Sequence, residues 1–140
     1  MPVAYDFAAI RVVPRVDREE FVNAGVILYC AQLKFLRAKV QVDESRLTAL
    51  WPGLDLGLVR QHLEAIPKIC AGSPDAGPIA ALTLSERFHW LVAPRSTMIQ
   101  ISPVHSGICA SPEPVLDDLF ARLVSGPPFS GAPFSNTSTG

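Results

Sequence analysis

The chain has 140 residues, of which 49% are hydrophobic and 18% charged, so we expect one domain with a substantial apolar core, and general disorder is excluded. Lysine and arginine number 12 against 13 aspartates and glutamates, and this net charge of −1 argues against the broad positive surface that nucleic-acid binding needs. The start "MPVAYDFAAI" does not resemble a signal peptide, and no apolar run approaches about 18 residues, so a cytoplasmic protein without a membrane span is expected.

The first part of the chain predicts three strands. Residues 5–13 and 21–29 are rich in aromatic and β-branched side chains, and the charged segment between them has the length of a hairpin loop. In residues 34–42 apolar and polar side chains alternate, which is typical of a strand with one face in water. Three consecutive strands predict an antiparallel meander.

Two helices are expected next. Asp43 or Ser45 can cap a short helix that the turn pair Pro52–Gly53 stops. From Leu56 to Ile66 apolar residues recur every three or four positions, which indicates an amphipathic helix. Pro67 should kink or end that helix, because proline lacks the backbone donor.

The second half of the chain predicts one more strand and one more helix. Residues 82–91 fit the helical and the strand period equally well, so their state stays open. Alternation in residues 96–102 predicts a strand that Pro103 closes. Residues 112–124, which begin with a proline after Ser111, give the clearest helical pattern of the chain.

These elements predict a single α+β domain over residues 1–124. Its sheet should be antiparallel, with four to five strands and with the two main helices packed on one face. Proline, glycine, serine and threonine dominate residues 125–140, which are expected to form a disordered tail outside the domain.

Neither a metal nor a cofactor is predicted. Cys30, Cys70 and Cys109 are odd in number and widely spaced, so they are interpreted as reduced core residues. The three histidines are equally dispersed. The sequence also lacks the phosphate-loop, dinucleotide-binding, nucleophile-elbow and zinc-helix motifs.

The first candidate site lies in "RVVPRVDREEFVNAGVILYC", residues 11–30. Arginine carries a planar fork of donors that matches carboxylate or phosphate, so Arg15 and Arg18 are candidates for binding an anion. Asn23 and Gly25 interrupt an apolar run, where a buried asparagine needs partners and a glycine marks a bulge or a close backbone approach. The pattern admits both a structural role and a ligand contact.

The second candidate site lies in "APRSTMIQISPVHSG", residues 93–107. Arg95, Ser96 and Thr97 combine a guanidinium fork with two hydroxyls, which suits phosphate or carboxylate, although a polar corner with local capping bonds would also explain them. His105 follows Pro103 in an expected turn. It could act as an acid or base near neutral pH, or only form hydrogen bonds.

These two segments, with "LSERFHWLVAPRSTMIQISPVHSGIC" and "PEPVLDDLFARLV", resemble the bacterial domain of unknown function family 3037 over about residues 5–124. The resemblance implies no established activity. It implies a small stand-alone bacterial protein with a HipA-like kinase as its partner. The motif positions of the family fall on the same two polar segments.

The leading hypothesis is a non-catalytic accessory or binding protein, the companion of a HipA-like kinase. Its arginine-lined site would receive a small anion or an acidic group of the partner, through Arg15, Arg18, Asn23, Arg95, Ser96, Thr97 and His105. The alternative hypothesis is a small enzyme that acts on a phosphate-containing or nucleotide substrate, with His105 as the acid or base.

Overall fold

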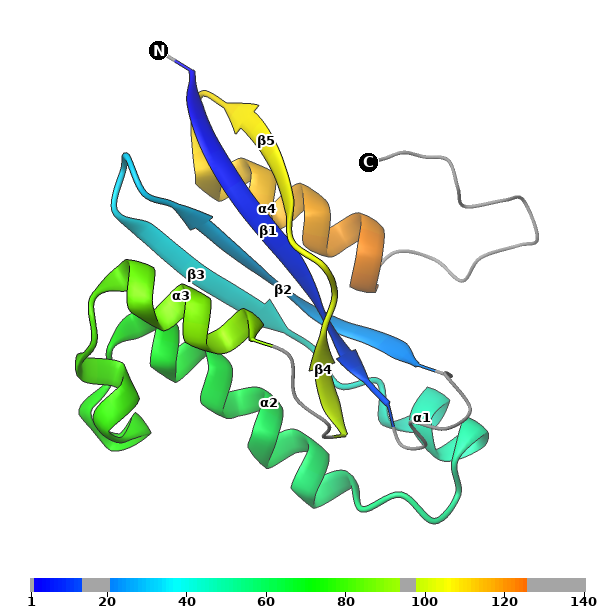
Figure 1. The fold of residues 1–140 in the computed structure, drawn as a ribbon. Helices are drawn as coiled ribbons and strands as arrows, with labels where there is room; N and C mark the ends of the chain where they lie inside the picture. The colour runs from blue at the N-terminus through cyan, green and yellow to red at the C-terminus, as the bar shows by residue number, and fades with distance from the viewer. Residues whose placement is uncertain (1, 14–20, 94–97, 126–140) are drawn as a thin grey trace.

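A computed structural model of the chain describes residues 2–13, 21–93 and 98–125 (Figure 1). The elements follow in the order β1 (Val3–Val12), β2 (Val22–Cys30), β3 (Phe35–Val40), α1 (Glu44–Leu50), α2 (Leu56–Ala71), the short 3-10 turns η2 (Pro74–Ala76) and η3 (Pro78–Ala81), α3 (Leu84–Val92), β4 (Ile99–Ile101), β5 (His105–Cys109), α4 (Pro112–Phe120) and the π-helical turn η4 (Ala121–Ser125).

The strands form one antiparallel sheet in the order β3-β2-β1-β4, and β5 also pairs with β1. This arrangement confirms the predicted α+β class, the meander of the first three strands and the sheet of four to five strands. The expected turn around His105 is wrong, because residues 105–109 form β5. β1 is ten residues long and β4 only three, so a second edge strand covers the part of β1 that β4 leaves unpaired.

The edge of the sheet changes register between β4 and β5. Ile101 pairs with Ile10, whereas His105 pairs with Phe7, so three residues of the edge oppose two residues of β1. Such an irregularity is the usual place for a proline in a sheet, because proline cannot donate to the ladder. Pro103 therefore separates two short strands rather than ending the sheet.

Ser102 forms hydrogen bonds to β1 at the point where this irregularity interrupts the backbone hydrogen bonds between the strands. Its side chain is buried, and its hydroxyl oxygen accepts a 2.8 Å hydrogen bond from the backbone N–H of Ala9. The backbone N–H of Ser102 donates to the carbonyl of Ala9 at 2.9 Å. Ser102 thus satisfies both backbone groups of Ala9 where the register shifts.

Replacing Ser102 with alanine should lower the free energy of unfolding by about 1–3 kcal/mol, because the buried N–H of Ala9 would lose its acceptor. The control is Ser106→Ala: Ser106 donates to Asp6 at 2.6 Å on the exposed surface, and its loss should change stability by less than about 0.5 kcal/mol. Urea unfolding measures both variants, and equal effects would contradict the structural role of Ser102.

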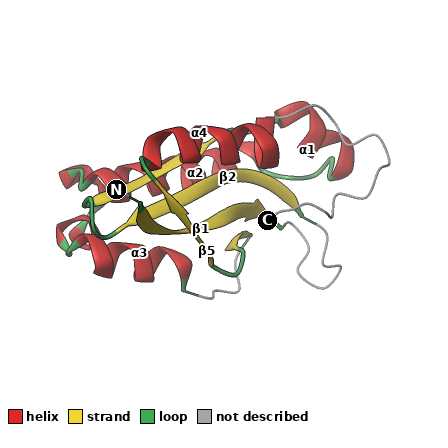
Figure 2. Cartoon of the chain, turned by 90° about the horizontal axis from the view of Figure 1, so that it is seen from above, coloured by secondary structure: helices red, strands yellow, loops and turns green. Residues whose placement is uncertain are grey.

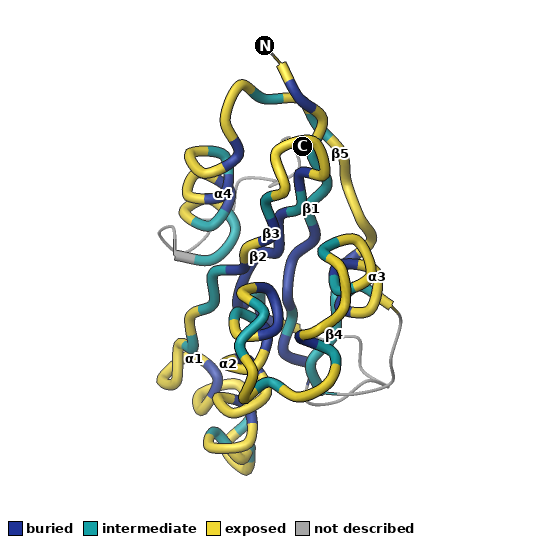
Figure 3. Tube along the Cα trace, turned by 90° about the vertical axis from the view of Figure 1, so that its left-hand side faces the viewer, coloured by how far each residue is buried: buried dark blue, intermediate teal, exposed yellow. Residues whose placement is uncertain are grey.

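Helices cover both faces of the sheet. α2 and α3 pack on the face that contains Ile27, whereas Leu116 and Leu119 of α4 pack against Val26 and Leu28. Figure 2 shows α3 and α4 on opposite sides of the strands, and in Figure 3 the buried strands run between them. The prediction that both main helices pack on one face is therefore wrong. β2 carries large apolar side chains on both faces, as its continuous apolar run allows.

Helix α2 continues through Pro67, which the sequence predicts to kink or end it. It ends at Gly72, whose φ of 73° is the left-handed conformation that favours glycine at a helix C-terminus. Ile69 and Cys70, beyond the proline, are buried in the core. The burial of that last turn offsets the backbone bond that the proline cannot make.

The segment that the sequence leaves open between helix and strand forms helix α3. A capping box between Thr83 and Glu86 begins it, and Phe88 and Leu91 point into the core. Arg87 fastens α3 to α2, since its Nη1 donates to the carbonyl oxygens of Ile69 at 3.0 Å and Cys70 at 2.9 Å.

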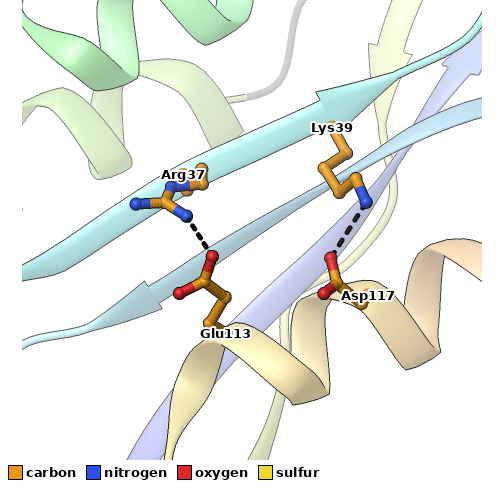
Figure 4. A network of polar contacts seen from close by, with 4 residues as sticks. All are labelled: Arg37, Lys39, Glu113 and Asp117. Atoms are coloured by element: carbon orange, nitrogen blue, oxygen red, sulfur yellow. Dashed lines mark hydrogen bonds and ion pairs between the residues drawn. The ribbon is translucent and has the colours of Figure 1, made fainter.

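Two ion pairs join α4 to β3 (Figure 4). Arg37 Nη1 lies 2.9 Å from Glu113 Oε2, and Lys39 Nζ lies 2.9 Å from Asp117 Oδ1. All four side chains are largely exposed, so each pair contributes below about 1 kcal/mol. The polar positions predicted for the wet face of β3 thus flank α4, and the apolar contacts of Leu116 and Leu119 hold the helix on the sheet.

Candidate functional site

A row of three polar residues crosses one end of the sheet. Arg11 of β1 pairs with Asn23 of β2 on one side and with Gln100 of β4 on the other. Directly paired residues on neighbouring strands place their side chains on the same face. The Asn23 side chain bonds to Leu123 after α4, so this polar row lies on the α4 face of the sheet.

A β-bulge in β2 places Asn23 in the polar row. Arg11 pairs with Asn23, but the residue before Arg11 pairs with Gly25, so Ala24 is the extra residue. The bulge shifts the alternation of β2. Val22 and Ala24 therefore join the core under α2 and α3, and Asn23 turns to the α4 face.

Packing explains the glycine beside the bulge. A Cβ atom on Gly25 would lie 2.6 Å from the carbonyl oxygen of Lys39 and 2.9 Å from Cδ1 of Ile10. The sequence predicts a bulge or a close backbone approach at this position, and both occur. The glycine signal therefore has a structural explanation.

Arg11 is a half-buried cation with no acidic partner among the described residues. Its guanidinium carbon lies 4.2 Å from the centroid of the Phe21 ring, a cation–π contact. Its Nε atom is buried, and no described atom accepts a hydrogen bond from it. Burial lowers the pKa of the Arg11 guanidinium, because taking a charge out of water is unfavourable.

Asn23 holds the chain after α4 and has spare bonding capacity. Its Nδ2 donates to the carbonyl oxygen of Leu123 at 3.2 Å. Its Oδ1 is buried and has no hydrogen-bond donor within the described part of the chain. Arg11 and Asn23 are paired neighbours, so one buried donor atom and one buried acceptor atom without a hydrogen-bond partner in the described part of the chain belong to adjacent residues of the polar row.

Five of the residues predicted for the site lie outside the described residues: Arg15, Arg18, Arg95, Ser96 and Thr97. The described residues that border their two segments do meet. Val13, before the first segment, donates its backbone N–H to the carbonyl oxygen of Met98, after the second, at 2.6 Å. Both segments therefore join the sheet at the end where the polar row lies.

His105 is on β5, away from the polar row. It is exposed, and its ring centroid lies 5.3 Å from that of Phe7, the residue it pairs with. Phe7 precedes Arg11 by four residues on β1, which is roughly 13 Å along a strand. No described residue forms a hydrogen bond with the His105 side chain. The structure brings Asn23 together with Arg11 and leaves His105 apart.

Gly107 shares this aromatic environment. A Cβ atom on Gly107 would lie 2.5 Å from the ring of Tyr5, its partner on β1. His105, which the sequence predicts to lie in a turn, and Gly107 are thus positions where β5 packs against aromatic residues of β1.

The sequence prediction of the site misses Gln100. Arg11 begins the first candidate segment but is not among the residues predicted to bind. The feature that could have indicated Arg11 as a site residue is its position. It is a charged residue near the end of a strand, and its neighbours in the chain, Ile10 and Val12, are fully buried. Its facing residues depend on the bulge in β2, which no local pattern of β1 reveals.

Other features of the described residues point to no second chemical centre. No group of three histidine, cysteine, aspartate or glutamate side chains there is placed to hold a metal ion. The three cysteines are free thiols. Cys30 and Cys70 are buried, as predicted, whereas Cys109 is only half-buried, so the prediction of a core position is wrong for Cys109. Burial raises the pKa of the Cys70 thiol to about 12. No described helix has the length and apolar character needed to cross a membrane.

Comparison with known protein families gives a match over most of the chain. The model of the family described as Protein of unknown function (DUF3037) matches residues 7–124, which include the whole polar row. Neither the curated proteins nor the solved structures contain a significant match.

Proposed function

The chain belongs to the DUF3037 family, whose description states no activity, and we propose that it is a cytoplasmic, non-catalytic binding or accessory protein. In this proposal Arg11 receives an acidic group of a partner protein. The observation that supports it is the half-buried Arg11 guanidinium, which no acidic side chain of the described residues neutralises. A carboxylate bound there would offset the cost of burying the charge.

The partner that the family resemblance suggests is a HipA-like kinase. We include Arg15, Arg18, Arg95, Ser96 and Thr97 in the proposed interface, because Val13 and Met98, which border their segments, lie at this end of the sheet. Their guanidinium and hydroxyl groups would add donors for further acidic groups of the partner. His105 is left out of the proposed interface.

Replacing Arg95 with alanine should reduce partner binding about tenfold or more, since a hydrogen bond to a charged group contributes about 1.5–3 kcal/mol. The melting temperature should stay within about 2 °C. Native mass spectrometry of the tagged protein, recovered gently from its host, measures the amount of kinase-sized partner.

The matched control is Arg37→Ala. Arg37 is an exposed arginine that pairs with Glu113, at the end of α4 opposite to the polar row, so its loss should leave partner recovery unchanged. Recovery of the wild-type protein without a partner would refute the accessory function. A large fall in the melting temperature of Arg95→Ala would instead assign Arg95 to the structural core.

A further inference from the structure

An apolar cavity of about 280 Å³ lies between α2, α3 and β4. Its walls are Ile66 and Ile69 of α2, Leu91 of α3, and Met98, Ile99 and Ile101 in and beside β4. Ile99 and Ile101 flank Gln100 on their strand, so the cavity lies on the face of the sheet opposite the polar row. It is a site separate from the one in the proposed function.

The walls of this cavity include apolar side chains that the fold leaves partly in water. Met98, Ile99 and Ile101 pack against the main core, yet each is only half-buried. Arg87 fixes α3 to the last turn of α2, through the carbonyl groups of Ile69 and Cys70, so the hollow is bounded by helices that are held in place. Apolar surface around a preformed hollow is the usual composition of a small-molecule site.

Two ring-bearing side chains complete the lining. Trp90 of α3 is 39% exposed, and His62 of α2 is also exposed, so both lie where the cavity opens to solvent. Flat rings favour contact with a flat ligand, and the imidazole of His62 supplies a hydrogen-bonding group beside otherwise aliphatic walls.

We propose that this cavity binds a small aromatic molecule of about two fused rings with one acidic substituent. The size follows from the volume: a cavity of about 150 Å³ holds one benzene ring, and this cavity is nearly twice as large. The rings would lie among the isoleucines, and the acidic group would lie at the mouth beside His62. The charge of that group remains solvated there, so its burial carries no penalty.

The test uses 2-naphthoate as the two-ring probe, benzoate as the one-ring probe and decanoate as the chain probe, each titrated into the full-length protein and followed by ¹H–¹⁵N NMR. 2-Naphthoate should bind saturably and shift the Trp90 indole signal. It should bind at least about tenfold more tightly than benzoate, because its second ring buries four more apolar carbons. Absence of saturable 2-naphthoate binding, or tighter binding of decanoate, would overturn the proposal.

Matched variants locate the probe. Ile101→Phe fills the cavity and should reduce 2-naphthoate affinity at least tenfold, whereas Ile108→Phe, the same change on the neighbouring edge strand at a side chain 74% exposed, should have no effect. Should Ile101→Phe fail to fold, His62→Ala replaces it: this variant should weaken 2-naphthoate several-fold and leave the uncharged 2-naphthylmethanol unchanged. Arg11→Met should not alter 2-naphthoate binding, and an effect there would place the probe in the polar row instead.

Discussion

Replacing Gly25 with alanine is expected to lower the free energy of unfolding by about 3 kcal/mol, a large effect for one added methyl group. The new Cβ would lie 2.6 Å from the backbone carbonyl oxygen of Lys39 on β3, and that atom cannot move without displacing the strand. The second contact, 2.9 Å from Cδ1 of Ile10, is to a side chain that is fully buried. Neither the Lys39 carbonyl oxygen nor the Ile10 side chain can move away from the new Cβ without displacing the residues around it.

Gly107→Ala is the matched comparison for that variant. Its Cβ would come equally close, 2.5 Å, to the ring of Tyr5. That ring is the end of a half-buried side chain and can turn aside, so the expected loss is about 1 kcal/mol. Urea unfolding of both variants measures the difference between their free energies of unfolding. The slope of that free energy against urea concentration should be the same in both variants. A cost for Gly107→Ala equal to that for Gly25→Ala would contradict the argument that the backbone contact decides.

The strand pattern of the sequence predicts the meander but not which helix covers which face. Val26, Ile27 and Leu28 form one apolar run, and such a run is compatible with burial on one face or on two. Only the position of α4 shows that Val26 and Leu28 contact one helix layer and Ile27 the other. Local periodicity contains no information about where a distant helix packs.

β5 escapes prediction for a related reason. Its first residues, from His105 to Gly107, follow Pro103 and have the composition of a turn, and they form a strand because β1 has an unpaired length beside them. The polar row depends on tertiary pairing in the same way, since Arg11, Asn23 and Gln100 come from three strands and one bulge. The sequence indicates that Asn23 and Gly25 are unusual, but their partners follow only from the register.

Replacing Arg11 with methionine is expected to weaken partner binding at the polar row and to leave the fold as stable as before, or more stable by up to about 1 kcal/mol. The lost bond to an acidic group should weaken binding at least tenfold. Stability should not fall, because methionine removes a half-buried charge that lacks an acidic partner in the described residues. Methionine also keeps a favourable contact with the Phe21 ring, in place of the cation–π contact.

The sign of this stability change follows from the pKa of Arg11. Burial lowers the pKa of the guanidinium in the folded state, so folding disfavours the protonated form. The resulting loss of stability is present at every pH below the folded-state pKa. An arginine stays protonated throughout the physiological range, and substitution rather than a pH change is therefore the practical way to remove the charge.

Urea unfolding and partner recovery, measured on the same Arg11→Met preparation, separate the two roles that a buried arginine can have. A structural arginine would make the variant unstable by more than about 1 kcal/mol and would reduce binding only through loss of folded protein. A binding arginine would leave stability intact while binding is lost, which is the pattern expected of a site whose unfavourable charge is compensated by its ligand. A stable variant that retains full binding would move the interface away from the polar row.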